Sequence, residues 1–314
     1  MGWSTLALVA LGAGCGDNTP ISFNHHEPGS SDASSASWCG SGGGQVTDAG
    51  GTLDCLSFAI VGDTRPPTID DTANYPTAII DRIYQDLQSE SPRPAFAITT
   101  GDYQFSRTTG SEAGKQIDLY LQAQAAFANP VFHAMGNHEC TGATDSNCTG
   151  TAATSNHNYA AFLSKMIQPH GLTHPYYSWK ISATDGSWTA KFVVVAANAW
   201  DSAQATWLDQ TLSENTTYTF VIRHEADYAG TAPGVKPSGQ ILAQHKYTLL
   251  LVGHTHTFDW IPAKREMVVG LGGAPLTGSI DYGYVVGRSR SDGAIQFAVY
   301  DYKTHATLAS FAVD

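Results

Sequence analysis

Short apolar runs that each end in a polar side chain able to bind a metal ion constrain the fold of this chain more than any other feature. Segments with helical periodicity separate several of these runs, and the alternation predicts an α/β fold with parallel strands. The carboxyl ends of such strands line one crevice, so we expect the polar side chains at the run ends to converge there. They are Asp63, Asp102, Asn137, His224 and the pair His254 and His256.

The same patterns define the expected elements. Strands are expected over 56–61, 95–99, 131–135, 176–181, 191–197, 218–222 and 247–252. Helices are expected through 79–87, from an N-cap at Ser111, and from an N-cap at Asp201 or Ser202. The C-terminal part of the chain is expected to form an antiparallel β run over 267–271, 282–286, 295–300 and 307–313.

Composition supports one sizeable folded core. Of 314 residues, 42% are hydrophobic and 14% are charged, which argues against a disordered or fibrous chain. The chain has 16 Lys and Arg residues against 28 Asp and Glu residues, a formal net charge of -12. Such a charge repels nucleic-acid backbones and anionic membrane surfaces, so we expect no nucleic-acid polymer as a partner. The sequence also lacks the Gly-x-Ser-x-Gly elbow of serine hydrolases.

The N-terminal segment 1–15 resembles a bacterial lipoprotein signal. Its apolar run 6–11 is too short to span a bilayer and leads through small residues to Cys15, which would become the lipidated first residue of the mature chain. We therefore expect an exported protein, either a periplasmic or cell-surface lipoprotein or a secreted protein, that meets a membrane only through a lipid anchor at Cys15. No Lys or Arg precedes the apolar run, and the alternative is a frayed apolar tail.

Segment 16–50 is rich in Ser and Gly and has no apolar periodicity, so we expect a flexible tether leading to a folded domain over 51–314. Besides Cys15 the chain has four cysteines, which allow three disulfide connectivities, and free thiols are the alternative. We favour pairing between sequence neighbours, Cys39 with Cys55 and Cys140 with Cys148. The second pair would close a short loop beside the candidate site.

The candidate ligands are oxygen and imidazole donors without a thiolate. Such donors suit borderline divalent metals such as Mn, Fe, Co or Zn, and a carboxylate between two groups of ligands is able to bridge two ions. A dinuclear centre of this kind acidifies a bridging water and clamps the oxygens of a phosphoryl group during in-line displacement. The residue types therefore predict a centre for two divalent or mixed-valence ions of Mn, Fe or Zn type.

Five sequence blocks in a fixed order carry a resemblance to a known family. They are GD at 62–63, GD at 101–102, GNHE at 136–139, VIRH at 221–224 and GHTH at 253–256. With these blocks the chain resembles the calcineurin-like metallophosphoesterases, which include the purple acid phosphatases, over about residues 56 to 260. The resemblance implies a two-sheet β-sandwich flanked by helices, with 51–314 as the catalytic domain. It also implies that a hydroxide on the dinuclear centre hydrolyses a small-molecule phosphate ester, and we favour monoesters slightly over diesters.

The resemblance further implies a role for each candidate residue. The bridging ligand would be Asp102, the other ligands of one ion would be Asn137, His224 and His254, and those of the first ion would be Asp63 and His256. His138 would stabilise the phosphoryl oxygens or protonate the leaving group. The alternative role for His138 is a structural hydrogen bond to a backbone carbonyl.

The first ion's ligand shell departs from the family at two positions. Arg65 stands where most of the family has a histidine ligand, and Phe105 stands where the purple acid phosphatases have a tyrosine ligand. Water or an unrecognised ligand such as Tyr103 would have to complete that shell. Arg65 is itself a candidate for holding a substrate phosphate bidentately, which is our reason for favouring monoesters, and a surface salt bridge is the alternative.

A second hypothesis keeps the fold but not the catalysis. If the altered shell does not hold the first ion, the chain would be a non-catalytic protein that binds a phosphate ligand through a single metal ion. Metal stoichiometry distinguishes the two hypotheses, because two ions per chain favour the enzyme and one ion favours the binding protein.

Overall fold

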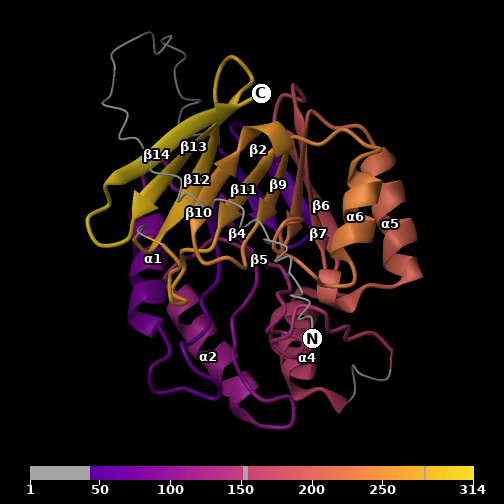
Figure 1. Cartoon of the computed structure of the whole chain (residues 1–314). Coiled ribbons are helices and arrows are strands. Elements are labelled where there is room, and N and C mark those ends of the chain that lie inside the picture. Colours follow the sequence, from indigo (N-terminus) through magenta and orange to yellow (C-terminus); the bar gives the residue numbers. More distant parts are fainter. Residues whose placement is uncertain (1–42, 151–154, 279–280) are drawn as a thin grey trace, which may run out of the picture. The chain divides into compact units, whose positions relative to one another are not determined.

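Two β-sheets form the centre of the structure, a computed structural model that describes residues 43–150, 155–278 and 281–314 (Figure 1). The eight-stranded sheet has the order β1-β2-β6-β7-β8-β9-β11-β10, and the six-stranded sheet has the order β14-β13-β12-β3-β4-β5. The strands of the larger sheet are β1 (Gly44–Thr47), β2 (Gly50–Leu53), β6 (Tyr177–Ala183), β7 (Thr189–Val195), β8 (Tyr218–Arg223), β9 (Leu249–Val252), β10 (Phe258–Ile261) and β11 (Glu266–Val269). Those of the smaller sheet are β3 (Ser57–Val61), β4 (Phe96–Thr99), β5 (Val131–His133), β12 (Gly283–Ser289), β13 (Ile295–Asp301) and β14 (Thr307–Val313).

The two sheets pack face to face over an aromatic core. Phe58 of β3 contacts Phe192 of β7 and Phe220 of β8 edge-on, with ring centroids 5.3 and 5.1 Å apart. All three rings are fully buried, and such edge-on packing adds to the gain from area burial. The neighbouring residues Val193 and Val195 of β7 belong to a second apolar cluster, as the period-2 alternation of a strand requires. The larger sheet is therefore buried on both faces.

Helices flank the two sheets (Figure 1). Leu208 of α5 (Ser202–Ser213) and Leu242 of α6 (Val235–Leu242) pack on the second apolar cluster of the larger sheet. Helices α1 (Thr77–Ser89) and α2 (Glu112–Gln124) lie side by side, and Ile80 and Ile83 of α1 join the main core. The remaining helical segments are α4 (His157–Phe162), η1 (Leu163–Ile167), η2 (Gln168–His170), η3 (Ala197–Ala199) and η4 (Pro262–Lys264).

The strands and helices expected from the sequence are confirmed in large part. Each of the seven strands expected before residue 253 is present, with ends within two residues of the expected ones. Asp201 is the N-cap of α5, where its carboxylate accepts the backbone N–H of Gln204, whereas Ser111 precedes α2 without a side-chain capping bond. The strand expected at 267–271 is present as β11 and is antiparallel to β10, but it belongs to the larger sheet, where it pairs in parallel with β9. Only β12, β13 and β14 form the antiparallel C-terminal run.

The expected boundary between tether and domain needs correction. The hairpin of β1 and β2 begins at Gly44 and pairs with β6, so the last part of the expected tether 16–50 belongs to the larger sheet. The expected signal over 1–15, with Cys15, and the tether as far as residue 42 lie outside the described residues. In the part of the chain that the structure describes, no helix is long and apolar enough to cross a bilayer.

One of the two expected disulfides is confirmed. Cys140 and Cys148 are bonded to each other. Cys55 is also disulfide-bonded, but its expected partner Cys39 lies outside the described residues.

Candidate metal centre

The six expected ligands meet at the carboxyl ends of five strands. Asp63 follows β3, Asp102 follows β4, Asn137 follows β5, His224 follows β8, and His254 and His256 follow β9. Three of these strands belong to the smaller sheet and two to the larger, so the expected two-sheet arrangement is confirmed and both sheets contribute ligands. The backbone N–H of His254 donates to Oδ1 of Asp63 at 3.0 Å and so joins the two sheet edges directly. The site lies where the sheets face each other.

One group of ligands, which we call the asparagine-side cluster, consists of Asp102, Asn137, His224 and His254. Ligand atoms of Asp102, His224 and His254 all lie within 4.8 Å of one another. Oδ1 of Asn137 lies 3.0 Å from Nε2 of His224 and 3.1 Å from Nδ1 of His254. The amide nitrogen of Asn137 donates to the carbonyl of Gly142 at 3.0 Å, which directs Oδ1 into the cluster.

The second group, the arginine-side cluster, consists of Asp63, Asp102 and His256. Their ligand atoms also lie within 4.8 Å of one another, and Nε2 of His256 is 3.6 Å from Oδ1 of Asp63. Nε of Arg65 lies 3.8 Å from Oδ2 of Asp102, at the edge of this cluster. Asp102 is thus common to both clusters, in the place of a carboxylate that bridges two ions.

Backbone carbonyls set the orientation of two imidazoles. Nδ1 of His224 donates to the carbonyl of Thr100 at 2.7 Å, and Nδ1 of His256 donates to the carbonyl of Pro275 at 2.8 Å. With these N–H groups directed outward, the Nε2 atoms point into the site toward carboxylate and amide oxygens, which are acceptors. Acceptors that face one another need a cation or a proton between them. The oxygen and imidazole donors therefore fit divalent metal ions.

Four of the ligands have a backbone conformation that side chains rarely adopt. The φ angles are 58° at Asp63, 63° at Asp102, 72° at His254 and 49° at His256. Such left-handed residues cost roughly 1–3 kcal/mol each and persist where the surrounding structure enforces them, commonly at functional sites. Gly253 allows the close approach, because a Cβ there would lie 2.4 Å from Oδ2 of Asp63.

Burial and neighbouring charges shift the pKa values of the ligands. Although burial disfavours a charged imidazole, the carboxylate of Asp102, 3.3 Å away, raises the pKa of His224 to about 10. Burial opposes the charged form of Asp102, but His224, His138 and Arg65 together hold its pKa well below its usual range. Burial raises the pKa of Asp63 to about 8. Burial, followed by the guanidinium of Arg65, lowers the pKa of His256. Burial likewise lowers the pKa of His254, to about 4, so a low imidazole pKa is common to both clusters and His224 is the exception.

Glu139 is a buried residue that the sequence analysis did not assign to the site. Its carboxylate accepts the backbone N–H groups of Asp102 at 2.8 Å, Tyr103 at 2.8 Å and Gly136 at 2.7 Å. These bonds hold the turn after β4 against the turn after β5, and so position Asp102. Burial raises the pKa of Glu139 to about 7. The available signal was its place in the GNHE block, directly after two assigned residues.

The two expected catalytic side chains lie beside the bridging carboxylate. Nε2 of His138 is 3.8 Å from Oδ2 of Asp102, as far from that oxygen as Nε of Arg65. Phe105 lies against both, with the Arg65 guanidinium 4.9 Å from its ring centroid and the His138 ring 4.6 Å away, edge-on. The side chain of Arg65 is only 16% exposed, so it does not form a surface salt bridge. Nδ1 of His138 has no hydrogen-bond partner in the described structure.

Tyr103 does not complete the shell of the first ion. Its hydroxyl donates to the carbonyl of Ala134 at 2.8 Å and bonds to the hydroxyl of Thr99, and the side chain is fully buried in the core. Its ring also packs against Tyr120. The suggestion of Tyr103 as an extra ligand is therefore wrong.

Comparison with known proteins identifies the family. The model of the calcineurin-like phosphoesterase family matches residues 56–258, more than half of the chain. The chain belongs to the calcineurin-like phosphoesterase family, and its two sheets flanked by helices are the metallophosphoesterase fold. The resemblance found in the sequence blocks is thereby confirmed. No curated protein matches the sequence.

Several solved structures are similar to this chain at low sequence identity. A purple acid phosphatase from yellow lupin (Lupinus luteus) seeds matches with a TM-score of 0.59 and 14% identity over 83% of this chain and 55% of the lupin chain. A putative 5'-nucleotidase from Staphylococcus aureus matches with a TM-score of 0.40 and 14% identity over 82% of this chain and 54% of the nucleotidase chain. Vacuolar Protein Sorting 29 from Cryptosporidium parvum matches with a TM-score of 0.38 and 13% identity over 82% of this chain and 97% of that chain. This chain thus spans about half of the lupin enzyme.

Proposed function

We propose that this protein is a metal-dependent hydrolase of small-molecule phosphate esters, with a preference for monoesters. The observation that carries the proposal is the pair of ligand clusters that share Asp102. Family membership supports phosphoester hydrolysis in general. The number of ions and the ester class are the parts that need experiment.

Each cluster has a defined task in this proposal. The asparagine-side cluster would hold one ion and the arginine-side cluster the other, with Asp102 between them. Two bound ions would neutralise charge on the phosphoryl group and acidify the attacking water. The protein contributes the fixed positions of the donors, which the carbonyls of Thr100 and Pro275 and the carboxylate of Glu139 maintain.

His138 would act on the phosphoryl or leaving-group oxygen. Burial, opposed by the Asp102 carboxylate, lowers the pKa of His138 to about 4. The ring is therefore neutral near pH 7 and donates a hydrogen bond from one nitrogen while the other accepts. Such a donor stabilises charge that develops on an oxygen in the transition state.

Arg65 would bind the substrate phosphate. Its guanidinium is largely buried beside Asp102 and is stacked over Phe105, which limits its freedom. A fixed guanidinium pairs well with two oxygens of one phosphoryl group. A monoester offers a dianionic terminal phosphoryl group and a diester only a monoanion, so this residue favours monoesters.

The first experiment compares hydrolysis of p-nitrophenyl phosphate and bis(p-nitrophenyl) phosphate by the full chain loaded with manganese. We expect chelator-sensitive turnover that is faster on the monoester, and we expect Asn137→Ala to lose it. Absence of turnover above that of Asn137→Ala in a folded, metal-loaded sample would reject the proposal. Metal analysis of the same sample should find two ions per chain, whereas one ion would support the non-catalytic phosphate-binding protein.

A second experiment tests the ester class. Arg65→Ala should reduce monoester turnover more than diester turnover, and Arg65→Lys should restore part of the difference because it keeps the charge but loses the bidentate geometry. Equal losses on both substrates would remove the reason for the monoester preference.

We also propose that the protein is exported and lipid-anchored at Cys15. The lipoprotein-like segment 1–15 supports this, and the Cys140–Cys148 disulfide is in keeping with an oxidising compartment. In a bacterial host, Cys15→Ser should move the protein from the membrane fraction to the soluble fraction. An unchanged distribution would argue against the anchor.

A further inference from the structure

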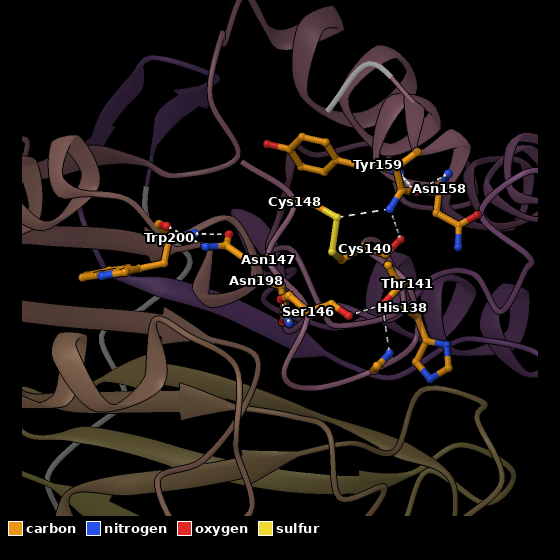
Figure 2. The surroundings of a disulfide bond; sticks show 12 residues. His138, Cys140, Thr141, Ser146, Asn147, Cys148, Asn158, Tyr159, Asn198 and Trp200 are labelled. Atoms are coloured by element: carbon orange, nitrogen blue, oxygen red, sulfur yellow. Dashed lines mark hydrogen bonds between the residues drawn. A yellow bond between two sulfur atoms is a disulfide. The ribbon is translucent and has the colours of Figure 1, made fainter. Parts of the chain in front are cut away.

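A covalently closed loop follows directly after the metal ligand Asn137. The disulfide between Cys140 and Cys148 closes the segment 140–148, which we call the cross-linked loop (Figure 2). Both cysteines are almost fully buried, whereas much of the loop between them is exposed. The role of this cross-link is not explained by the ligand clusters themselves.

The start of the loop holds both the backbone and the side chain of Asn137. The backbone carbonyl of Asn137 accepts the N–H groups of Cys140, Thr141 and Gly142 at 3.1, 3.1 and 3.0 Å. The side-chain amide of Asn137 donates to the carbonyl of Gly142 at 3.0 Å. Gly142 has φ +83°, a conformation that glycine adopts without strain. Since the amide nitrogen is committed to the loop, the amide oxygen is the atom left for the asparagine-side cluster.

Two further asparagines fix the loop from outside. The amide of Asn156 donates to the carbonyl of Cys140 at 2.8 Å and to Sγ of Cys148 at 3.2 Å. The amide of Asn198 donates to the carbonyls of Thr144 and Ser146 at 3.1 and 2.9 Å. Both asparagines are buried. Their bonds tie the loop to the start of α4 and to η3, which are parts of the folded core.

We propose that the cross-linked loop positions the side chain of Asn137. The Cys140–Cys148 disulfide and the hydrogen bonds that Asn198 donates to the loop would then set the metal affinity of the asparagine-side cluster. The inference rests on the proposed function, because it takes that cluster to be an ion site. A carboxamide is a weak neutral ligand that contributes only when its oxygen is already directed at the ion. Without the cross-link, the Gly142 carbonyl is free to move and Asn137 to rotate away.

The test measures manganese binding directly by calorimetry on the full chain, without reference to turnover. Cys140→Ser/Cys148→Ser should weaken binding at the asparagine-side cluster about tenfold or more, as loss of outer partners of metal ligands commonly does. Binding at the arginine-side cluster should change little. The matched control is Asp145→Ala, an exposed residue of the same loop, which should bind manganese as the unaltered protein does.

A double-mutant cycle separates positioning from general loosening of the fold. In an Asn137→Ala background, the cysteine substitutions should cause no further loss of affinity, because the side chain they act through is absent. Asn198→Ala keeps the disulfide and should weaken the same ion, also only when Asn137 is present. If the cysteine double variant does not fold, the Asn198→Ala cycle decides alone.

The outcomes are distinct from those of the proposed function. The positioning role would be overturned, even in an active enzyme, by either of two results. One is an equal loss of manganese affinity with and without the Asn137 side chain, and the other is an unchanged affinity in the folded loop variants. Selective loss at one ion in a protein that hydrolyses neither model ester would keep the positioning role and reject the proposed hydrolase.

Discussion

The two ligand clusters share Asp102 but have different surroundings. The asparagine-side cluster has two imidazoles, the Asp102 carboxylate and a carboxamide that is anchored through the cross-linked loop. The arginine-side cluster has one imidazole and two carboxylates, and the guanidinium of Arg65 lies at its edge. A guanidinium is positively charged, as a metal ion is, and therefore disfavours binding of an ion beside it. We therefore expect the asparagine-side cluster to bind its ion more tightly.

If both clusters bind ions, a shared carboxylate does not by itself make the two sites equal. The neighbours of the ligands would decide the affinity of each site, by supplying either donors or like charge. The guanidinium that we expect to weaken one site is also suited to bind a substrate phosphate. The following predictions start from the largest expected effect on this comparison and proceed to the smallest.

Asp102→Asn should affect both clusters. Loss of the shared carboxylate charge should lower turnover by about 10³-fold or more, since stabilisation by metal ions is worth several kcal/mol. Steady-state kinetics and metal analysis on the same sample check this. The control is Asp118→Asn, an exposed residue of α2. If Asp102→Asn keeps one tightly bound ion and most of its activity, Asp102 is not the bridge.

Glu139→Gln should weaken manganese binding at both clusters by a similar factor. The substitution turns an acceptor oxygen into an amide that faces the backbone N–H groups of Asp102, Tyr103 and Gly136. Leaving a buried donor unpaired costs about 1–3 kcal/mol, so we expect a loss of roughly tenfold to a hundredfold in manganese affinity. Calorimetric titration gives both affinities, and a loss confined to one ion would show that Glu139 does not act through Asp102.

Arg65→His should make the two clusters more alike. It removes a like charge, worth on the order of 1–3 kcal/mol at an effective dielectric constant of about 20, and supplies an imidazole donor. We expect manganese affinity at the arginine-side cluster to rise about tenfold or more while monoester turnover falls. Arg65→Ala, which removes the charge without adding a donor, should show a smaller rise. An unchanged affinity in both variants would mean that Arg65 does not weaken this site.

We expect the two clusters to differ, by at most about one, in the number of protons that their ligands release when an ion binds. Because the pKa of His224 is raised to about 10, His224 is protonated in the metal-free protein near neutral pH, and an ion at the asparagine-side cluster must displace that proton. Affinity for this ion should therefore increase as pH rises toward that pKa. In the arginine-side cluster, His256 has a lowered pKa and no proton to release, whereas burial raises the pKa of Asp63 to about 8, so Asp63 should release about half a proton near pH 8.

Calorimetry near pH 8 in buffers of different ionisation enthalpy measures the release. The heat of the tighter binding step should depend on the buffer by the equivalent of about one proton from His224. A tighter step whose heat is the same in all buffers would contradict this assignment.

Local sequence patterns were enough to find the candidate ligands, which the structure brings together. Each candidate ligand follows an apolar run and belongs to a short block of glycine and polar residues. Both features are visible in the sequence without knowing which strands pair with each other. The N-cap at Asp201 and the pairing of Cys140 with Cys148 are equally local. Tyr103 shows the limit of this reasoning, because its place beside Asp102 suggested a ligand while its side chain points into the core.

The sequence by itself determined the α/β alternation, the six ligand types and their positions at strand ends, because these depend on residues close together in the chain. Only the tertiary structure decided that the ligands come from two facing sheets, since β3 lies between β4 and the distant β12 and not in the sheet of β8 and β9. It also decided which carbonyls orient the imidazoles, that Glu139 holds Asp102, and that Arg65 lies beside the shared Asp102. These contacts join residues far apart in the chain, and no local periodicity encodes such contacts.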